Sequence, residues 1–331
     1  MITVDGSYGE GGGQILRSAI ALSCITGKSV EIAKIRANRP KPGLAAQHLK
    51  GIEAAKELTS ADVEGLKIGS TRVVFKPSNV KSKKIEIDIG TAGSVTLILQ
   101  SVLPPALLYG CSMRIRGGTD VRWAPTADYF KEVTLPALSE LGVRCGMRIL
   151  QRGYYPKGGG LIEIDAEESS LEGKKFQNRE EKVIRGISHC SNLSGVAERQ
   201  AESARSYLES SGFKAEIEVR SYRGYSTGSA ITLWTAYKGG SSLGERGKRA
   251  EKVGVEAARE IIGEINSKAC FDRHLADQVM VFAAVAKGRT VYTTSEVTMH
   301  QKSSAYVIER FLGKRVEFEG GKVTIDGAGI I

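Results

Sequence analysis

The chain has 331 residues, of which 41% are apolar and 25% charged, proportions typical of a globular protein with a sizeable core. Its formal net charge of +10 favours a polyanionic partner such as nucleic acid, nucleotide or acidic lipid. No apolar run reaches the ~18 residues of a membrane span and no signal-peptide pattern is present, so we expect a cytoplasmic protein without membrane contact.

Clusters of glycine along the chain predict the joints of an internal repeat, because glycine permits positive φ and close backbone approach. In the first copy, the glycines at 9–13 precede a helix predicted at 14–26. A strand at 29–36 follows, and Pro42-Gly43 opens a second helix that runs to about Leu58. The order is therefore helix, strand, loop and helix.

Two further copies show the same order. The second copy has glycines at 90 and 93, a helix to about 109, a strand near 113–116 and a helix at about 126–141. The third copy has helices at 274–286 and about 301–312 around a strand at 290–294. Alternating apolar residues predict flanking strands at 70–77, 84–89, 161–165, 315–319 and 322–326.

A different pattern interrupts the third copy. It predicts strands at 183–188, 214–220 and 230–236 with helices at 196–208 and 252–265. The fold class is therefore α/β (α+β), with three repeated units of two helices and a four-stranded sheet. A smaller α+β domain is inserted in the third unit. The predicted division is 1–180, 181–268 and 269–331, with the inserted domain in the middle.

The chain has only four histidines, and the repeat gives one of them a distinctive place. His300 falls at the start of the second helix of the third copy, where Pro42-Gly43 and Pro125-Thr126 hold the matching places in the others. Backbone N–H groups at a helix start favour phosphates and disfavour a protonated ring, so we expect a neutral, nucleophilic imidazole. A capping or packing role is the alternative.

Polar side chains gather around the first glycine cluster. Glu10 is the one carboxylate within that loop and is a candidate metal ligand, with a solvated turn acid as the alternative. Arg17 follows one turn into the helix, and Arg39 and Gln47 belong to the next loop and helix. Guanidinium groups suit phosphate oxygens, so these residues predict a phosphate clamp; a solvated basic face is the alternative.

Several segments together resemble the RNA 3′-terminal phosphate cyclase family, in the same order and over nearly the whole chain. They are Asp5-Gly6, Gly9 to Arg17, Arg39 to Leu44, Gln47-His48, Gly90 to Ser94, Gly117 to Asp120, Pro156 to Gly160, Leu275 to Gln278 and the stretch around His300. The resemblance implies three two-helix, four-stranded units with an inserted small domain, which agrees with the repeat.

The resemblance also implies roles for individual residues. His300 matches the catalytic histidine, Glu10 the metal-binding glutamate, and Arg17, Arg39 and Gln47 the phosphate- or RNA-binding positions. By this resemblance, the family's ATP-binding positions match Gln100, His274, Leu275, Ala276, Asp277 and Gln278. Many relatives have tyrosine where this chain has His274, and either ring can stack on adenine.

The activity implied is ATP-dependent conversion of an RNA 3′-phosphate to a 2′,3′-cyclic phosphodiester, through histidine–AMP and RNA-adenylate intermediates. ATP is a substrate, a divalent metal such as Mg²⁺ or Mn²⁺ assists, and RNA with a 3′-phosphate end is the partner. One alternative is a non-catalytic ribosome-assembly factor of the same fold, although retention of His300 argues against it. Another is an enolpyruvyl transferase. The sequence leaves open whether the chain forms a homo-oligomer.

Overall fold

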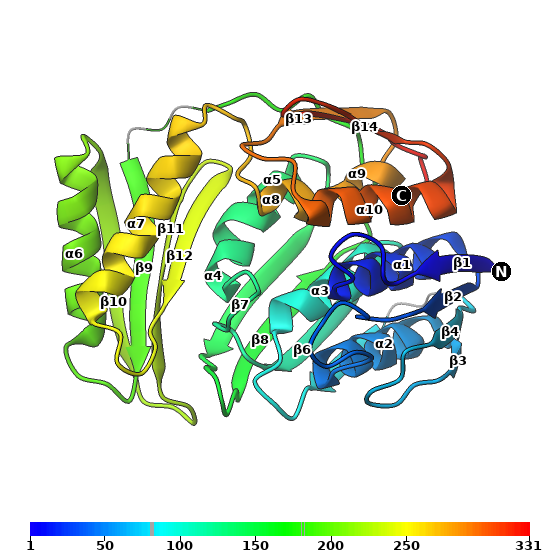
Figure 1. The fold of residues 1–331 in the computed structure, drawn as a ribbon, viewed down its shortest axis with the longest axis horizontal. Helices are drawn as coiled ribbons and strands as arrows, with labels where there is room; N and C mark the ends of the chain where they lie inside the picture. Colours follow the sequence, from blue (N-terminus) through cyan, green and yellow to red (C-terminus); the bar gives the residue numbers. More distant parts are fainter. Residues whose placement is uncertain (80–82, 180, 182) are drawn as a thin grey trace.

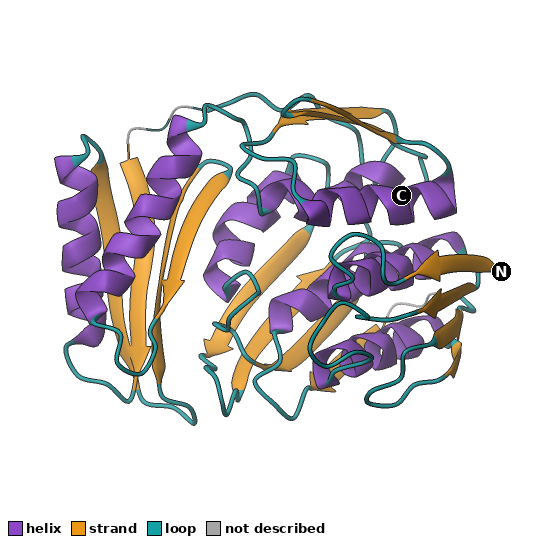
Figure 2. Cartoon of the chain, viewed as in Figure 1, coloured by secondary structure: helices purple, strands orange, loops and turns teal. Residues whose placement is uncertain are grey.

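The computed structural model describes residues 1–79, 83–179, 181 and 183–331. It has the predicted α/β class, with helices packed on several small sheets (Figure 2). Figure 1 shows a larger body at the right and a smaller body, built from β9 to β12 with α6 and α7, at the left.

The first unit has the sheet order β1-β2-β4-β3, with β1 and β2 parallel and the other pairs antiparallel. Its elements are β1 (Ile2–Asp5), α1 (Gly13–Thr26), β2 (Val30–Ala33), α2 (Ala46–Thr59), β3 (Asp62–Glu64) and β4 (Val73–Lys76). Gly27, at a φ of 68°, ends α1 in the left-handed conformation that glycine tolerates.

The second unit repeats this order as β5-β6-β8-β7, again with its first pair parallel. Its elements are β5 (Lys83–Asp88), α3 (Val95–Ala106), β6 (Cys111–Gly117), α4 (Ala127–Tyr129), η1 (Phe130–Thr134), α5 (Leu135–Ser139), β7 (Cys145–Gln151) and β8 (Gly160–Ala166). The helix predicted at 126–141 contains the π-helical turn η1 at its centre.

The third unit differs from the predicted four-stranded sheet, because its named strands are three, in the order β13-β15-β14. Single parallel bridges from Glu172 to Lys287 and from Lys175 to Val291 stand where the first strand lies in the other units. The elements are α8 (Leu275–Gln278), α9 (Met280–Val285), β13 (Arg289–Thr293), α10 (Met299–Leu312), β14 (Val316–Glu319) and β15 (Lys322–Asp326). The single helix predicted at 274–286 is thus two short ones.

The inserted segment forms a sheet of its own, ordered β10-β9-β11-β12 and covered by two helices. Its elements are β9 (Val183–Ser191), α6 (Val196–Ser210), β10 (Lys214–Tyr222), β11 (Gly228–Thr235), β12 (Lys238–Leu243) and α7 (Ala250–Asn266). A separate apolar cluster, drawn wholly from this segment, supports the predicted inserted domain. The boundaries stay a prediction, and residues 180 and 182 beside one of them lie outside the described residues.

One large apolar cluster joins the three repeated units. Helix α1 is buried along nearly its whole length because it packs against α3 of the second unit and α10 of the third. This packing brings the glycine loop before α1 close to the start of α10. Within the described part of the chain, no helix has both the length and the apolarity needed to cross a membrane.

Candidate active site

Helix α10 presents His300 at its amino end. Thr298 precedes the helix, and its hydroxyl accepts a hydrogen bond from the Gln301 N–H at 3.3 Å, which caps the first turn. His300 is the second residue of α10 and its side chain is 43% exposed. A reactant can therefore reach the ring, at the helix start that the repeat predicted.

The repeat places different residues at the equivalent position of the other two units. Gln47 is the second residue of α2. Asp128 is the second residue of α4, a helix that begins directly after the capping Thr126. The expectation that Pro42-Gly43 opens the helix of the first unit is wrong, because α2 begins at Ala46. Only the third unit therefore has a nucleophilic ring at this position.

Two carboxylates from distant parts of the chain hold the His300 ring. Nδ1 lies 3.2 Å from Asp277 Oδ2, and Nε2 lies 3.1 Å from Glu10 Oε2. The hydrogen bond to Asp277 is the largest cause that raises the pKa of His300, and the Glu10 charge adds to it. The expectation that the helix start disfavours protonation of this imidazole is therefore wrong, because the two carboxylates shift its pKa in the opposite direction.

The glycine loop brings Glu10 to this ring together with an arginine. Arg39 Nη2 lies 3.2 Å from Glu10 Oε2, and the side chains are 42% and 43% exposed. A Cβ on Gly12 would lie 3.0 Å from Arg39 Nη2, so the guanidinium packs directly on the loop backbone. Arg39, Glu10 and His300 thus form one accessible row.

Arg17 lies deeper, on the first turns of α1. Its Nε donates to Gln100 Oε1 and its Nη2 to Gln14 Oε1, both at 2.7 Å. Gln14 in turn donates to Ser304 of α10 at 3.1 Å, which ties the two helices together. Burial lowers the pKa of Arg17 to about 10, so the group remains a cation at neutral pH.

His48 and Gln47 complete this side of the site. A Cβ on Gly13 would lie 2.4 Å from His48 Nε2 and 2.9 Å from Arg17 Nη1, so only glycine fits between them. Burial lowers the pKa of His48 to about 3, which leaves a neutral ring beside the arginine. Gln47 Oε1 accepts the N–H of Ser94 at 3.1 Å and connects the first and second units.

The 274–278 run borders the site from the other side, and its members differ in accessibility. Leu275 and Ala276 are fully buried. Gln278 is also buried and accepts a hydrogen bond from Thr134 at 3.0 Å. Only His274 is exposed, and its Nε2 lies 3.4 Å from Glu260 Oε1 on α7 of the inserted segment.

His274 is therefore the exposed side chain of the run, and its stacking on a nucleobase stays a prediction. Burial opposes its protonation, but the hydrogen bond to Glu260 and the surrounding carboxylates raise the pKa of His274 to about 9. Sequence reasoning missed Glu260 and Asp272, which position this run. Asp272 stands just before the predicted helix, where aspartate is a known start signal, and that signal could have identified it.

The chemistry of the site suits a divalent cation at Glu10. This carboxylate is exposed and lies beside the groups predicted to meet phosphates, and Mg²⁺ is commonly held by one carboxylate together with substrate phosphates. A second group, Asp120, Asp128 and His189, is buried, with ligand atoms within 4.8 Å of one another. The Arg152 guanidinium pairs with Asp128 there. The positive charge next to these carboxylates is therefore a side chain of the protein, and we assign no metal ion to this cluster.

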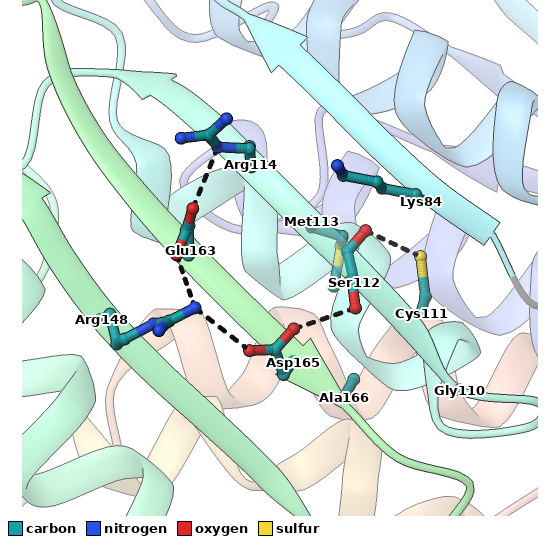
Figure 3. Close-up of a pocket in the computed structure, with 10 residues that line it drawn as sticks. All are labelled: Lys84, Gly110, Cys111, Ser112, Met113, Arg114, Arg148, Glu163, Asp165 and Ala166. Carbon is teal, nitrogen blue, oxygen red and sulfur yellow. Dashed lines mark hydrogen bonds and ion pairs between the residues drawn. The ribbon is translucent and has the colours of Figure 1, made fainter.

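A hollow lies elsewhere, on the second sheet (Figure 3). It has a volume of about 660 Å³. Figure 3 shows Glu163 between Arg114 and Arg148, with which it pairs at 3.1 and 2.7 Å. None of the predicted site residues lines it, so it does not belong to the candidate site.

Comparisons with known proteins find similar sequences over nearly the whole chain. A family model described as RNA 3′-terminal phosphate cyclase matches residues 8–318. A protein of this name from Archaeoglobus fulgidus is 62% identical, with 98% of this chain and 100% of that protein covered. Those from Methanococcoides burtonii and Pyrococcus abyssi are 48% and 46% identical and cover 96% and 98% of this chain, and 97% and 98% of their own lengths. The solved structure of EPSP synthase from Acinetobacter baumannii aligns with 95% of this chain and 45% of that chain, at a TM-score of 0.37 and 13% identity.

Proposed function

This chain belongs to the RNA 3′-terminal phosphate cyclase family, and from that premise we propose that it converts an RNA 3′-phosphate into a 2′,3′-cyclic phosphodiester at the expense of ATP. The observation that carries the proposal is the accessible His300 at the start of α10, held by Asp277 on one nitrogen and facing Glu10 with the other. ATP and RNA with a 3′-phosphate end are the partners. Both are available in the cytoplasm, which is the location we propose.

The first step forms a bond between His300 and AMP. An ionised carboxylate can only accept a hydrogen bond, so Nδ1 of His300 keeps its proton and donates a hydrogen bond to Asp277. The neutral ring then has its lone pair on Nε2. Nε2 attacks the α-phosphorus of ATP and pyrophosphate leaves. The proton of a resting imidazolium must leave first, and Glu10 lies within hydrogen-bond distance of that nitrogen.

Two further transfers complete the reaction. An oxygen of the RNA 3′-phosphate attacks the phosphorus of the histidine–AMP, the N–P bond breaks, and an RNA-adenylate forms. The adjacent 2′-OH then attacks the activated 3′-phosphorus, loses its proton, and expels AMP as the ring closes. Covalent catalysis of this kind divides one difficult displacement into easier ones.

The remaining predicted residues bind and orient the phosphates. Arg17 and Arg39 supply guanidinium groups on either side of the glycine loop, and Gln47 lies at the neighbouring helix start. His274 and Gln100 are the residues proposed to contact the nucleotide. A divalent cation bound at Glu10 would offset negative charge on the transferring phosphoryl group.

Intact-mass measurement after incubation with ATP and Mg²⁺ or Mn²⁺ tests the proposal. The wild type should gain the mass of one AMP, in a bond stable to hydroxide and labile to acid. His300→Ala should gain nothing while keeping the wild-type circular dichroism spectrum. An AMP adduct of the same stability on the folded His300→Ala protein would mean that another residue is the nucleophile.

The same measurement separates the alternatives. A non-catalytic RNA-binding assembly factor would form no adduct in the wild type. An enolpyruvyl transferase would also form none, and would instead release phosphate from phosphoenolpyruvate. Conversion of a 3′-phosphorylated oligoribonucleotide to a phosphatase-resistant end then tests the later steps, with a 2′-deoxy terminus as the substrate that cannot close the ring.

A further inference from the structure

Asp272 is a fully buried carboxylate where three parts of the molecule meet. Its Oδ1 accepts the N–H groups of His274 at 2.8 Å and Leu275 at 2.7 Å, at the start of α8. Its Oδ2 accepts the N–H of Gly239 in β12 of the inserted segment at 2.8 Å. The hydroxyl of Tyr129, in the second unit, lies 2.7 Å from both oxygens.

These partners require an ionised carboxylate. Each of them is a donor, and they approach both oxygens, whereas an asparagine amide could accept on one side only. Burial raises the pKa of Asp272 to about 6, so the group is still mainly ionised at neutral pH. Asparagine would therefore release either the start of α8 or the inserted segment.

Helix α8 depends on such external support. It has only four residues, and a helix this short is not stable by itself in water. Asp277 lies on α8, and its Oδ2 is the partner of His300 Nδ1. The position of α8 therefore decides whether Asp277 reaches the ring.

We propose that Asp272 is a positioning residue, which ties the inserted domain and the second unit to α8 and so holds Asp277 against His300. The inference rests on the proposed role of His300 as the nucleophile. It gives the inserted domain a defined part in the reaction. Gly239 and Glu260 of that domain support the 274–278 run at its backbone and at the His274 ring.

The test is a double-mutant cycle on the rate of AMP-adduct formation, measured with saturating ATP and Mg²⁺ at a single pH. The rate should slow about 10- to 100-fold in Asp272→Asn, because small displacements of reacting groups have effects of that size. Since Asp272 acts through Asp277, Asp272→Asn should slow the reaction little further when Asp277→Asn is already present. A general loss of stability would instead slow the reaction by the same factor in both backgrounds.

Thr232→Val is the matched control. It removes a buried hydrogen bond of 2.8 Å between Thr232 of the inserted segment and Thr126 of the second unit, but leaves the 272–278 stretch untouched. Its adduct rate should equal that of the wild type. A loss of rate in Thr232→Val as large as that in Asp272→Asn would overturn the specific role of Asp272.

The proposal is also overturned if Asp272→Asn keeps the wild-type rate while Asp277→Asn slows adduct formation, or if the effects of the two substitutions simply add. Should Asp272→Asn not fold, Tyr129→Phe removes one donor and keeps the carboxylate, and it should slow adduct formation more in the wild-type background than in the Asp277→Asn background. Equal effects of Tyr129→Phe in the two backgrounds would then count against the proposal. Failure of the proposed function has a different signature, because the wild type itself would form no AMP adduct.

Discussion

The two carboxylates at His300 set the pH range in which the ring can attack. A protonated imidazole has no lone pair to offer, so formation of the AMP adduct should increase with pH as His300 loses its proton. Asp277 and Glu10 raise the pKa of His300, which places this increase above the ordinary histidine range. In Asp277→Asn the increase should move to lower pH. Adduct rates measured across pH in both proteins decide this, and coincident profiles would contradict it.

Glu10 is placed to serve the chemistry rather than the fold. Its side chain is exposed on a glycine loop, so Glu10→Ala leaves no cavity. We expect unchanged unfolding in urea, but a higher concentration of Mg²⁺ or Mn²⁺ for half-maximal adduct formation. Glu10→Ala and wild type that show the same metal titration would exclude Glu10 as a ligand.

The two arginines should respond differently to replacement by lysine. Arg17 is buried and makes two hydrogen bonds at 2.7 Å, so Arg17→Lys should impair cyclisation by about 1–3 kcal/mol in the activation free energy. Arg39, whose side chain is 42% exposed, should lose less in Arg39→Lys, about 1 kcal/mol or below. Rates with a 3′-phosphorylated oligoribonucleotide measure both. Wild-type rates in both variants would mean that neither arginine binds the phosphates and that both belong to a solvated basic face.

At the scale of the element, the Thr298 cap of α10 should both stabilise the protein and hold His300 in position. Thr298→Val removes the hydroxyl that accepts from the Gln301 N–H, at nearly constant volume. Loss of such a cap costs about 1 kcal/mol in the free energy of unfolding. Because His300 lies within this first turn, adduct formation should also slow. Urea unfolding and adduct rates test the two effects, and a slower rate without lower stability would argue against the cap.

The sequence predicted the elements whose signal is local. Helices α1, α6, α7 and α10 have apolar residues at helical spacing, and all four form close to the predicted residues. Strand β12 was missed because Lys238–Leu243 has little apolar alternation and pairs only through β11. The break between α8 and α9 was also missed.

For the candidate site, the local pattern predicted which residue is the candidate nucleophile but not its surroundings. His300 lies at a helix start as the repeat indicated. The direction of its pKa shift was predicted incorrectly because Glu10 comes from the first unit and Asp277 from another helix of the third unit, and only the tertiary packing brings them to the ring. The role of Asp272 likewise depends on Tyr129 and Gly239, which no spacing in the sequence relates to it.

At the scale of the whole molecule, a buried charged cluster attaches the inserted segment to the second unit. His189 of β9 lies 3.3 Å from Asp128 and 3.6 Å from Asp120, and Arg152 pairs with both aspartates. The hydroxyl of Tyr154 lies 2.6 Å from His189 Nδ1. Burial and the Arg152 charge oppose protonation, but the aspartates outweigh them and raise the pKa of His189. When His189 is protonated, the positive charges of His189 and Arg152 offset the negative charges of Asp120 and Asp128.

This cluster predicts a pH dependence of stability. A histidine whose pKa is raised by folding stabilises the protein fully below its unfolded pKa, and this contribution is lost as pH rises through the folded pKa. We expect His189→Gln to unfold at lower urea concentration at about pH 6, with a loss of about 3–5 kcal/mol in the free energy of unfolding. Its stability should also depend less on pH than that of the wild type as pH rises above the ordinary histidine range. Equal slopes against pH in variant and wild type would assign the titration to other groups.

The position of the insertion also has a consequence for the order of folding. The bridges at Glu172 and Lys175 reach Lys287 and Val291 across the entire inserted segment. Closing so long a loop with an unfolded chain is entropically costly, and it becomes cheaper once the intervening residues have already collapsed into their own apolar cluster. We therefore expect the inserted segment to fold before the sheet around β13 is complete. His300 lies beyond the first strand of that sheet. The site around His300 would then form only after the inserted segment has folded.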